Sequence, residues 1–193
     1  MGNSTYQLNL PYGLTYGQEY NILFVADTDN HRVMKYLHSN LNGTLVCGNN
    51  SPGTNRTQLW YPRGITFDQS TNSVLIANYR AHNVVRWVLS DTEWSIIAGN
   101  SNGINGISSS SLYYPTDVKL DPMNNIYIVD QGNHRIQFLS AGQLNATSIA
   151  GKTGQVGINS TLFNSPNALA LDNQLNLYVV DWYNSRIQKF LRY

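Results

Sequence analysis

Four prolines recur at nearly equal spacing and divide the chain into four similar units. The segments around them read LPYGLTY at 10–16, YPRGITFD at 61–68, YPTDVKLD at 114–121 and SPNALALD at 165–172, and successive prolines lie 51, 53 and 51 residues apart. A period near 50 residues predicts an array of one supersecondary unit, because such a unit buries its apolar faces only by stacking on its neighbours.

Each unit carries a second signature about 16 residues after its proline. The four copies read LFVADTDNHRVMKY (23–36), VLIANYRAHNVVRW (74–87), IYIVDQGNHRIQFL (126–139) and LYVVDWYNSRIQKF (177–190). Short apolar runs such as IYIV are typical of strands buried on both faces, and stretches such as DPMNN are typical of turns. A short segment that ends in glycine closes the first three units, as in TLVCG at 44–48. Each complete unit therefore predicts four short strands, a to d, and no long helix.

Four strands per unit at this period predict an all-β fold, a β-propeller of four-stranded antiparallel blades. We expect a single domain over residues 1–193, with repeats at about 10–60, 61–113, 114–164 and 165–193, the last of which lacks its outer strand. The chain alone is not expected to close a ring. It would be a segment of a longer array, form an open arc or close with another chain, and we favour the first two. The exposed c strand at 186–191 could then pair with another chain.

The repeated segments resemble the NHL repeat. The resemblance rests on the P-x-G-[LI]-T segments and on the signatures, of which DNHRV and GNHRI match closely, YNSRI well and RAHNVV poorly. It covers residues 10 to 190 and implies blades of a propeller that typically has six. Because this family carries many functions, the resemblance predicts the fold and leaves the function to the site.

The second signature pairs an Asp at the end of strand b with an Arg at the start of strand c. These pairs are Asp27 with Arg32, Asp130 with Arg135 and Asp181 with Arg186, and the second unit replaces both members, with Asn78 and Asn83. We expect the Asp to accept hydrogen bonds from the N–H groups of its own turn, and the Arg to form a charge-assisted pair with it. A catalytic group needs a unique environment, whereas these groups recur, so we interpret them as a structural turn clasp.

The candidate metal sites lack the residue types that would bind the ion. The segment DTDNHR starts like a calcium loop, but Arg32 and His38 stand where that loop needs its Gly and its Glu. The family resemblance raises peptidyl-hydroxyglycine amidating lyase, whose zinc histidines directly follow the blade proline. The matching residues here are Tyr12, Arg63, Thr116 and Asn167, and none supplies an imidazole. We therefore predict no metal, no cofactor and no enzymatic activity, and keep a lyase of this type as an alternative.

Composition argues against nucleic acid and membranes as partners. Charged residues make up 12% of the chain and the net charge is +1, which gives little of the basic field that nucleic acid requires. RNA binding, known for some NHL domains, is kept as a further alternative. No apolar run approaches the roughly 18 residues of a membrane span, and the first ten residues do not resemble a signal peptide.

The favoured function is a recognition or scaffold module that binds a protein, a peptide or a glycan. In propellers the b–c and d–a connections emerge on one face, so side chains there that depart from the repeat are candidate binding residues. They are Tyr12, Arg63, Tyr79, Arg80, Thr116, Asn167, Trp182 and Tyr183. Tyr, Trp and Arg are the residue types that dominate binding energy at interfaces.

Six Asn-x-Ser/Thr sequons are candidate glycosylation sites. They begin at Asn3, Asn42, Asn49, Asn55, Asn145 and Asn159, and none falls in a predicted a or b strand. Glycans tolerate such peripheral positions. This placement agrees with an extracellular glycoprotein, and a cytoplasmic location stays open.

Overall fold

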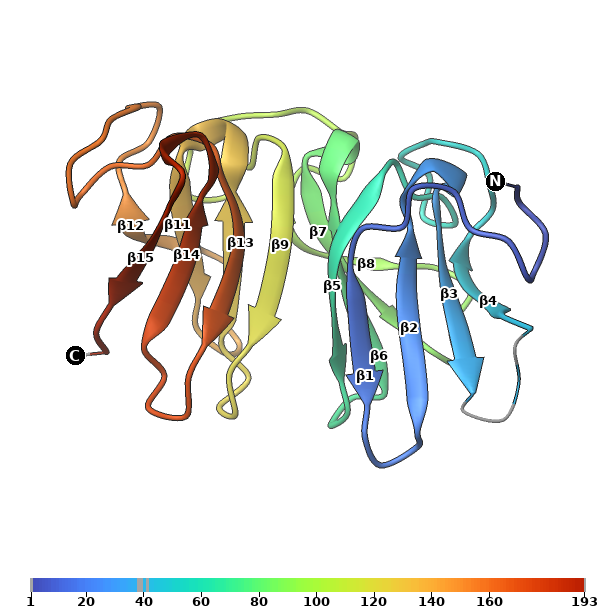
Figure 1. Cartoon of the computed structure of the whole chain (residues 1–193). Coiled ribbons are helices and arrows are strands. Elements are labelled where there is room, and N and C mark those ends of the chain that lie inside the picture. The colour runs from blue at the N-terminus through green and yellow to red at the C-terminus, as the bar shows by residue number, and fades with distance from the viewer. Residues whose placement is uncertain (1, 38–39, 41, 193) are drawn as a thin grey trace.

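The computed structural model describes residues 2–37, 40 and 42–192 and shows an all-β chain. Its strands form four antiparallel sheets, and in each sheet neighbouring strands follow one another along the chain. The first strands of the four sheets lie side by side in the middle of Figure 1, with β4 and β12 at the flanks. The sheets are arranged as blades of a propeller, which confirms the predicted fold class.

The strands of each blade are as follows. The first blade contains β1 (Leu14–Gly17), β2 (Ile22–Asp27), β3 (Arg32–Leu37) and β4 (Thr44–Gly48). The second contains β5 (Pro62–Asp68), β6 (Ser73–Asn78), β7 (Asn83–Val88) and β8 (Ser95–Gly99). The third contains β9 (Pro115–Leu120), β10 (Ile126–Asp130), β11 (Arg135–Leu139) and β12 (Thr147–Gly151). The fourth contains β13 (Pro166–Leu171), β14 (Leu177–Asp181) and β15 (Arg186–Phe190), which make a three-stranded sheet within the described part of the chain.

The second and third strands of every blade are joined by one 3-10 turn. These turns are η1 (Thr28–Asn30), η2 (Tyr79–Ala81), η3 (Gln131–Asn133) and η4 (Trp182–Asn184). Each ends at a residue in the left-handed conformation, namely His31, His82, His134 or Ser185. Within residues 2–37, 40 and 42–192, no helix is long and apolar enough to cross a membrane.

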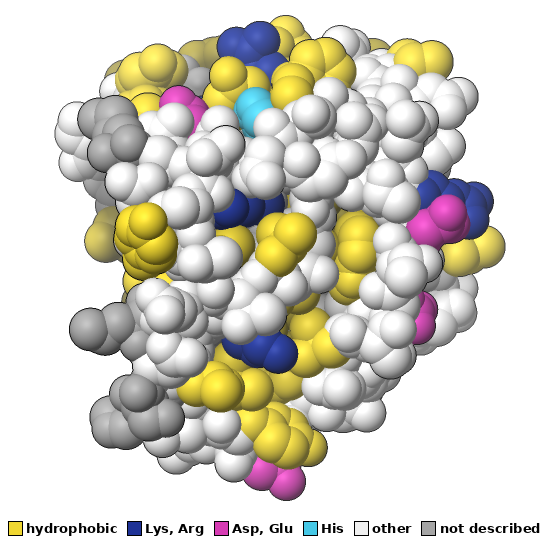
Figure 2. Space-filling view, turned by 90° about the vertical axis from the view of Figure 1, so that its right-hand side faces the viewer, with side chains coloured by type: hydrophobic (Ala, Val, Ile, Leu, Met, Phe, Trp, Pro, Cys, Tyr) yellow, Lys and Arg dark blue, Asp and Glu magenta, His cyan; other side chains and the backbone are white. Residues whose placement is uncertain are grey.

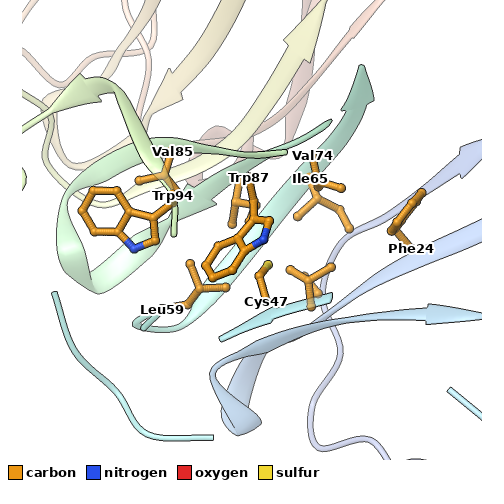
Figure 3. Packing of buried hydrophobic residues seen from close by; sticks show 11 residues of the cluster. Phe24, Cys47, Leu59, Ile65, Val74, Val85, Trp87 and Trp94 are labelled. Atoms are coloured by element: carbon orange, nitrogen blue, oxygen red, sulfur yellow. The ribbon is translucent and has the colours of Figure 1, made fainter. Parts of the chain in front are cut away.

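Apolar side chains of adjacent blades interleave at the joints between them. We call the side of a blade that packs against the preceding blade its front face, and the opposite side its back face. At the first joint, Phe24 from the back face of the first blade stacks on Phe67 from the front face of the second, with ring centroids 4.9 Å apart. Figure 3 shows the same cluster, in which Trp87 and Cys47 lie close together. Cys47 is fully buried, and this burial raises the pKa of its thiol.

The Asp and Arg side chains of the signature form ion pairs in three blades, which are buried in the first and third blades and partly exposed at Arg186 in the fourth. Arg32 Nε lies 2.7 Å from Asp27 Oδ2, and Arg135 Nε lies 2.8 Å from Asp130 Oδ2. The corresponding distance from Arg186 to Asp181 is 2.7 Å. All three carboxylates are completely buried. An ion pair removed from water is stable only when its remaining donors and acceptors are also satisfied, so the other contacts of the pair matter.

Those contacts correct one expectation. The other oxygen of each Asp accepts a hydrogen bond from the loop before the blade proline, not from the N–H groups of its own turn. Asp130 Oδ1, for example, accepts from the Tyr113 backbone N–H at 2.7 Å. The guanidinium of Arg135 donates to the carbonyls of Ile107, Ser108 and Ser111 in the same loop. The clasp therefore fastens the top of a blade to the loop that leads into it.

The N-terminal segment takes this role in the first blade. Arg32 donates to the carbonyl oxygens of Asn3, Ser4 and Gln7, at 2.7 to 2.9 Å. Asn30 donates to the carbonyl of Gly2, as Asn133 does to that of Gly106. Residues 2–10 thus occupy the place that a d–a loop occupies in the later blades.

The second blade lacks the ion pair and keeps only part of the clasp. Asn78 Oδ1 accepts from the Trp60 backbone N–H at 2.6 Å, as Asp130 Oδ1 does from that of Tyr113. With Asn78 and Asn83 in place of the pair, Asn78 Nδ2 and Asn83 Oδ1 are buried without a hydrogen-bond partner. The indole N–H of Trp94 instead donates to the Gln58 carbonyl at 2.9 Å. Gln58 stands four residues before its blade proline, as Ser111 does in the third blade. One indole thus replaces part of the guanidinium's anchoring.

Histidines at the ends of the 3-10 turns link each blade to the next. The Nδ1 atom of His31 accepts a hydrogen bond from the Tyr61 backbone N–H at 3.2 Å, and His82 and His134 accept equivalent bonds from Tyr114 and Ser165 at 3.1 Å. Only an unprotonated Nδ1 can accept. Burial lowers the pKa of all three imidazoles from their ordinary value of 6.5.

The clasp predicts a specific pattern in a double-mutant cycle. Arg135→Asn leaves the Asp130 carboxylate buried without its counter-charge and is expected to lower the free energy of unfolding by about 3–5 kcal/mol. Asp130→Asn/Arg135→Asn reproduces the pair of the second blade and is expected to cost at least about 1 kcal/mol less, because no uncompensated charge stays buried. Denaturant unfolding of both variants and of Asp130→Asn measures this. A double variant as unstable as Arg135→Asn would contradict the ion-pair interpretation.

The histidine links predict a loss of stability in mild acid. Since the folded pKa values lie below 6.5, the unfolded chain binds protons first, and the stabilisation present above pH 6.5 falls as the pH drops below it. Denaturant unfolding between pH 7 and pH 5 should show this slope. In His31→Asn/His82→Asn/His134→Asn the slope should be shallower, because Asn tolerates the left-handed conformation and does not titrate. Equal slopes in the two proteins would rule the links out as its source.

Candidate functional site

The loop face combines the 3-10 turns with the loops that precede the blade prolines. In Figure 1 these turns lie together at the upper end of the blades. Figure 2 shows basic side chains at this end, next to hydrophobic side chains and a histidine, on a surface that is otherwise mostly uncharged. The clasps hold the backbone of this face through buried contacts, so its exposed side chains stand on a fixed support.

Arg63 and two tyrosines form the central cluster of this face. The guanidinium carbon of Arg63 lies 3.5 Å from the ring centroid of Tyr79 and 5.2 Å from that of Tyr12. Tyr79 in turn stacks on Tyr114, with centroids 4.6 Å apart. A cation over aromatic faces is an attractive arrangement that also fixes the orientation of long side chains. Three predicted binding residues are therefore brought together by the fold.

A small pocket lies beside this cluster, between the first strands of the blades, and combines apolar lining such as Leu14 and Ile65 with a few polar groups. It has a volume of about 200 Å³, and its polar lining comes from Tyr12, Asp117, Lys119 and Asn167. Asp117 Oδ1 is 2.9 Å from Lys119 Nζ, and Asp117 Oδ2 accepts from the Leu169 backbone N–H at 3.1 Å. The pocket thus offers a carboxylate, an ammonium group, an amide and a phenol within one hollow.

Tyr12 and Asn167 join the first blade to the fourth across this pocket. Burial raises the pKa of Tyr12, while a hydrogen bond to the side chain of Asn167 and the nearby Arg63 act in the opposite direction. Asn167 Oδ1 also accepts from Gln131 Nε2 at 3.1 Å. The phenol of Tyr12 is therefore protonated at neutral pH and available as a donor or an acceptor.

The other predicted binding residues lie apart from the cluster. Arg80 is exposed and lies over Tyr61, 5.4 Å from its centroid. Trp182 and Tyr183 are exposed on the fourth blade and stack on each other at 4.9 Å. Thr116 is the exception, because its side chain is fully buried with its hydroxyl unpartnered. As a surface contact for a ligand, Thr116 was predicted wrongly.

Sequence reasoning missed Asp117 and Lys119. A signal was present, because Asp117 stands two residues after its blade proline, where the first two repeats carry Gly13 and Gly64. These glycines are required by close packing: a Cβ at Gly64 would lie 2.4 Å from Asp117 Oδ1. The departure from glycine in one repeat is therefore what places a carboxylate at the pocket.

A larger hollow of about 480 Å³ lies between the third and fourth blades. It is mostly apolar and is lined by Tyr127, Phe138, Leu177 and Phe190, among others. Its carboxylate, Asp121, is engaged by Asn125 and by the Met123 backbone N–H. Its lining side chains come from the facing third and fourth blades, and β15 is the outermost strand of the described part of the fourth blade. We therefore interpret this hollow as space left between two packed blades and not as a ligand site.

The titratable residues of the described ranges do not assemble into a metal centre. No group of three or more His, Cys, Asp or Glu side chains is placed to hold an ion within residues 2–37, 40 and 42–192. The three histidines of the turns use Nδ1 for the interblade links, and His38 lies outside the described residues.

The six sequon asparagines are all exposed. Asn159 Oδ1 accepts from both the backbone and the hydroxyl of Thr161, at 3.0 Å. Their use as glycosylation sites stays a prediction.

Comparison with known proteins identifies the repeat. The NHL repeat family matches residues 112–137 and 163–190, which confirms the resemblance in the third and fourth repeats. Protein SUPPRESSOR OF QUENCHING 1, chloroplastic, of Arabidopsis thaliana is 24% identical over 206 residues, covering 94% of this chain. The chain spans only 20% of that protein's length.

Two solved structures share the fold at low identity. A gluconolactonase from Xanthomonas campestris superposes with a TM-score of 0.74 and 14% identity, over 98% of this chain and 60% of the gluconolactonase. A chain of a nidogen/laminin complex superposes with a TM-score of 0.70 and 18% identity, over 94% of this chain and 59% of the other. One of these is named as an enzyme and the other as part of a protein complex, so the likeness supports the propeller fold alone.

Proposed function

Because the chain carries NHL repeats folded as a β-propeller, we propose that it is a non-enzymatic recognition or scaffold module. Its loop face binds a protein, a peptide or a glycan. The observation that carries this proposal is the stack of Arg63 on Tyr79 and Tyr12 beside the small pocket.

The cluster supports binding because its side chains are already ordered. Arg63 is held over two rings, and Tyr79 is held against Tyr114. A preorganised surface loses less side-chain entropy when a ligand arrives, so more of the contact energy becomes affinity. Arg and Tyr are also the residue types whose truncation most often weakens an interface.

The state of Asp117 supports binding over catalysis. Its two oxygens already accept from Lys119 Nζ and from the backbone N–H groups of Val118 and Leu169. A carboxylate whose two oxygens are already engaged by three donors is poorly placed to remove a proton from a ligand. The group is instead a fixed acceptor next to a fixed ammonium, which suits ligands with several hydroxyl or amide groups.

The proposal is tested by screening the purified chain against glycan and peptide arrays. Arg63→Ala and Tyr79→Ala are expected to weaken any true loop-face ligand by roughly 30-fold, the effect of losing a residue that contributes about 2 kcal/mol. Gln174→Ala is the matched control, because this exposed side chain lies in the turn between β13 and β14, away from the cluster. A ligand whose affinity is unchanged in both loop-face variants would show that binding occurs elsewhere and would contradict the proposal.

We also propose that the protein is extracellular and glycosylated. The support is that all six sequon asparagines are exposed and lie outside the first and second strands of every blade. When the chain is expressed through a secretory pathway, its mass should fall after enzymatic removal of N-glycans. Asn159→Gln should remove one glycan from that total. A mass that the enzyme leaves unchanged would refute glycosylation of this protein.

A further inference from the structure

The guanidinium of Arg63 stands on the loop face without a counter-charge. It lies over the rings of Tyr79 and Tyr12, and Arg63 is half-buried. Among the residues that the structure describes, it forms no ion pair, whereas four other arginines are each paired with an Asp, namely Arg32, Arg86, Arg135 and Arg186. A positive charge that is held in place and left unpaired is a ready partner for an anion.

The ring contacts of Arg63 favour a carboxylate as that anion. A guanidinium that interacts with an aromatic ring through its face keeps its N–H groups free in its own plane. There they match the two oxygens of a carboxylate, which accept two parallel hydrogen bonds. Tyr79 also fixes the direction in which the charge of Arg63 is presented, because their separation is only 3.5 Å.

The polar groups of the small pocket beside Arg63 are mostly donors. Lys119 Nζ gives one N–H to Asp117 Oδ1 at 2.9 Å and keeps its other N–H groups. The phenol of Tyr12 is protonated and carries a further donor. The carboxylate of Asp117 already accepts from three donors. A complementary ligand must therefore be rich in acceptor oxygens.

The size and lining of the pocket favour a sugar over a peptide. Its volume of about 200 Å³ is below the roughly 300–1,000 Å³ of sites for drug-sized ligands, so it holds one small residue of a longer ligand. Ile65 and Ala168 line one part of it and suit the C–H face of a sugar ring. Each sugar hydroxyl can turn to accept from a fixed donor, whereas each peptide N–H needs an acceptor, and the pocket has few.

We propose that the loop face binds a glycan through a uronate residue. The carboxylate of the uronate pairs with Arg63, and its hydroxyls accept from Lys119 and Tyr12. The charges of Asp117 and Lys119 balance each other, so Arg63 alone sets the charge that the ligand must match. These groups come from the first three blades, whose first strands lie side by side (Figure 1). The assignment rests on the recognition function proposed above and specifies its ligand.

Paired ligands test the carboxylate separately from the hydroxyls. Trisaccharides of galacturonate, glucuronate, mannuronate and guluronate are titrated into the purified chain by calorimetry, each alongside its methyl ester, which keeps the hydroxyls and loses the charge. At least one acid should bind about tenfold or more tightly than its ester, since a hydrogen bond to a charged group contributes at least this factor. Tri-glutamate, which carries carboxylates without sugar rings, should bind at least about tenfold more weakly than that acid.

Two variants divide the contacts. Arg63→Gln should reduce the preference for the acid over its ester to about twofold or less, because neither form then meets a cation. Tyr12→Phe removes one hydroxyl, so it should weaken acid and ester alike, by roughly fivefold, and preserve the preference. Arg56→Gln is the matched control for charge. Its side chain is exposed, its carbonyl accepts from the Trp94 N–H next to the outer strand β8, and the variant should keep the preference.

Three results would overturn the proposal. Acids and esters that bind equally well would show that no carboxylate is recognised. Tri-glutamate that binds as tightly as the best acid would point to an acidic peptide as the ligand. If no uronate binds, while the arrays yield another ligand that depends on Arg63 and Tyr79, the recognition function stands and the uronate assignment fails. If the arrays also yield no such ligand, both proposals fail.

Discussion

The pair of Asp and Arg at the top of the first, third and fourth blades is the contact that joins each hairpin to the loop before it. It costs desolvation energy, and it is stable here because the carboxylate and the guanidinium find partners for their other polar atoms in one loop. The same contacts order a connection that contains no strand. A hairpin, an ion pair and an irregular loop thereby become one rigid unit, repeated around the arc.

The anchoring contacts and the exposed side chains involve different atoms, which explains how one backbone carries different surfaces. The clasps and the histidine links bind mainly backbone atoms of the loops, so they constrain the chain path and not the side chains beside the proline. Tyr12, Arg63 and Asn167 occupy equivalent sites and differ completely in chemistry. The loop face can therefore vary without loss of the fold, which is the behaviour expected of a recognition surface on a constant scaffold.

The repeat predicted the blades and the Asp–Arg pairs, because both follow from spacing within one unit. It did not predict what each Asp binds with its second oxygen, since that donor, such as the Tyr113 N–H for Asp130, lies 17 residues away and outside the hairpin that carries the pair. Nor did it predict that Thr116 is buried while Arg63 is stacked between tyrosines, although both follow a blade proline. Burial and stacking at these two positions depend on contacts with side chains of the neighbouring blade, and the local sequence does not show which of those side chains lie nearby.

The position of the clasp contacts along the sequence determines where the chain can be divided into complete repeat units. Asn30, Asn133 and Asn184 each donate to the carbonyl of a glycine, at Gly2, Gly106 and Gly157, nine residues before the blade proline. A unit cut from one such glycine to the next keeps the loop together with the pair that anchors it. A unit cut at the proline separates them and leaves a buried carboxylate without its backbone donor. Duplication or exchange of blades, in the laboratory or in evolution, should therefore succeed when the unit begins at this glycine. The repeat that is easiest to see in the sequence begins nine residues later, at the proline.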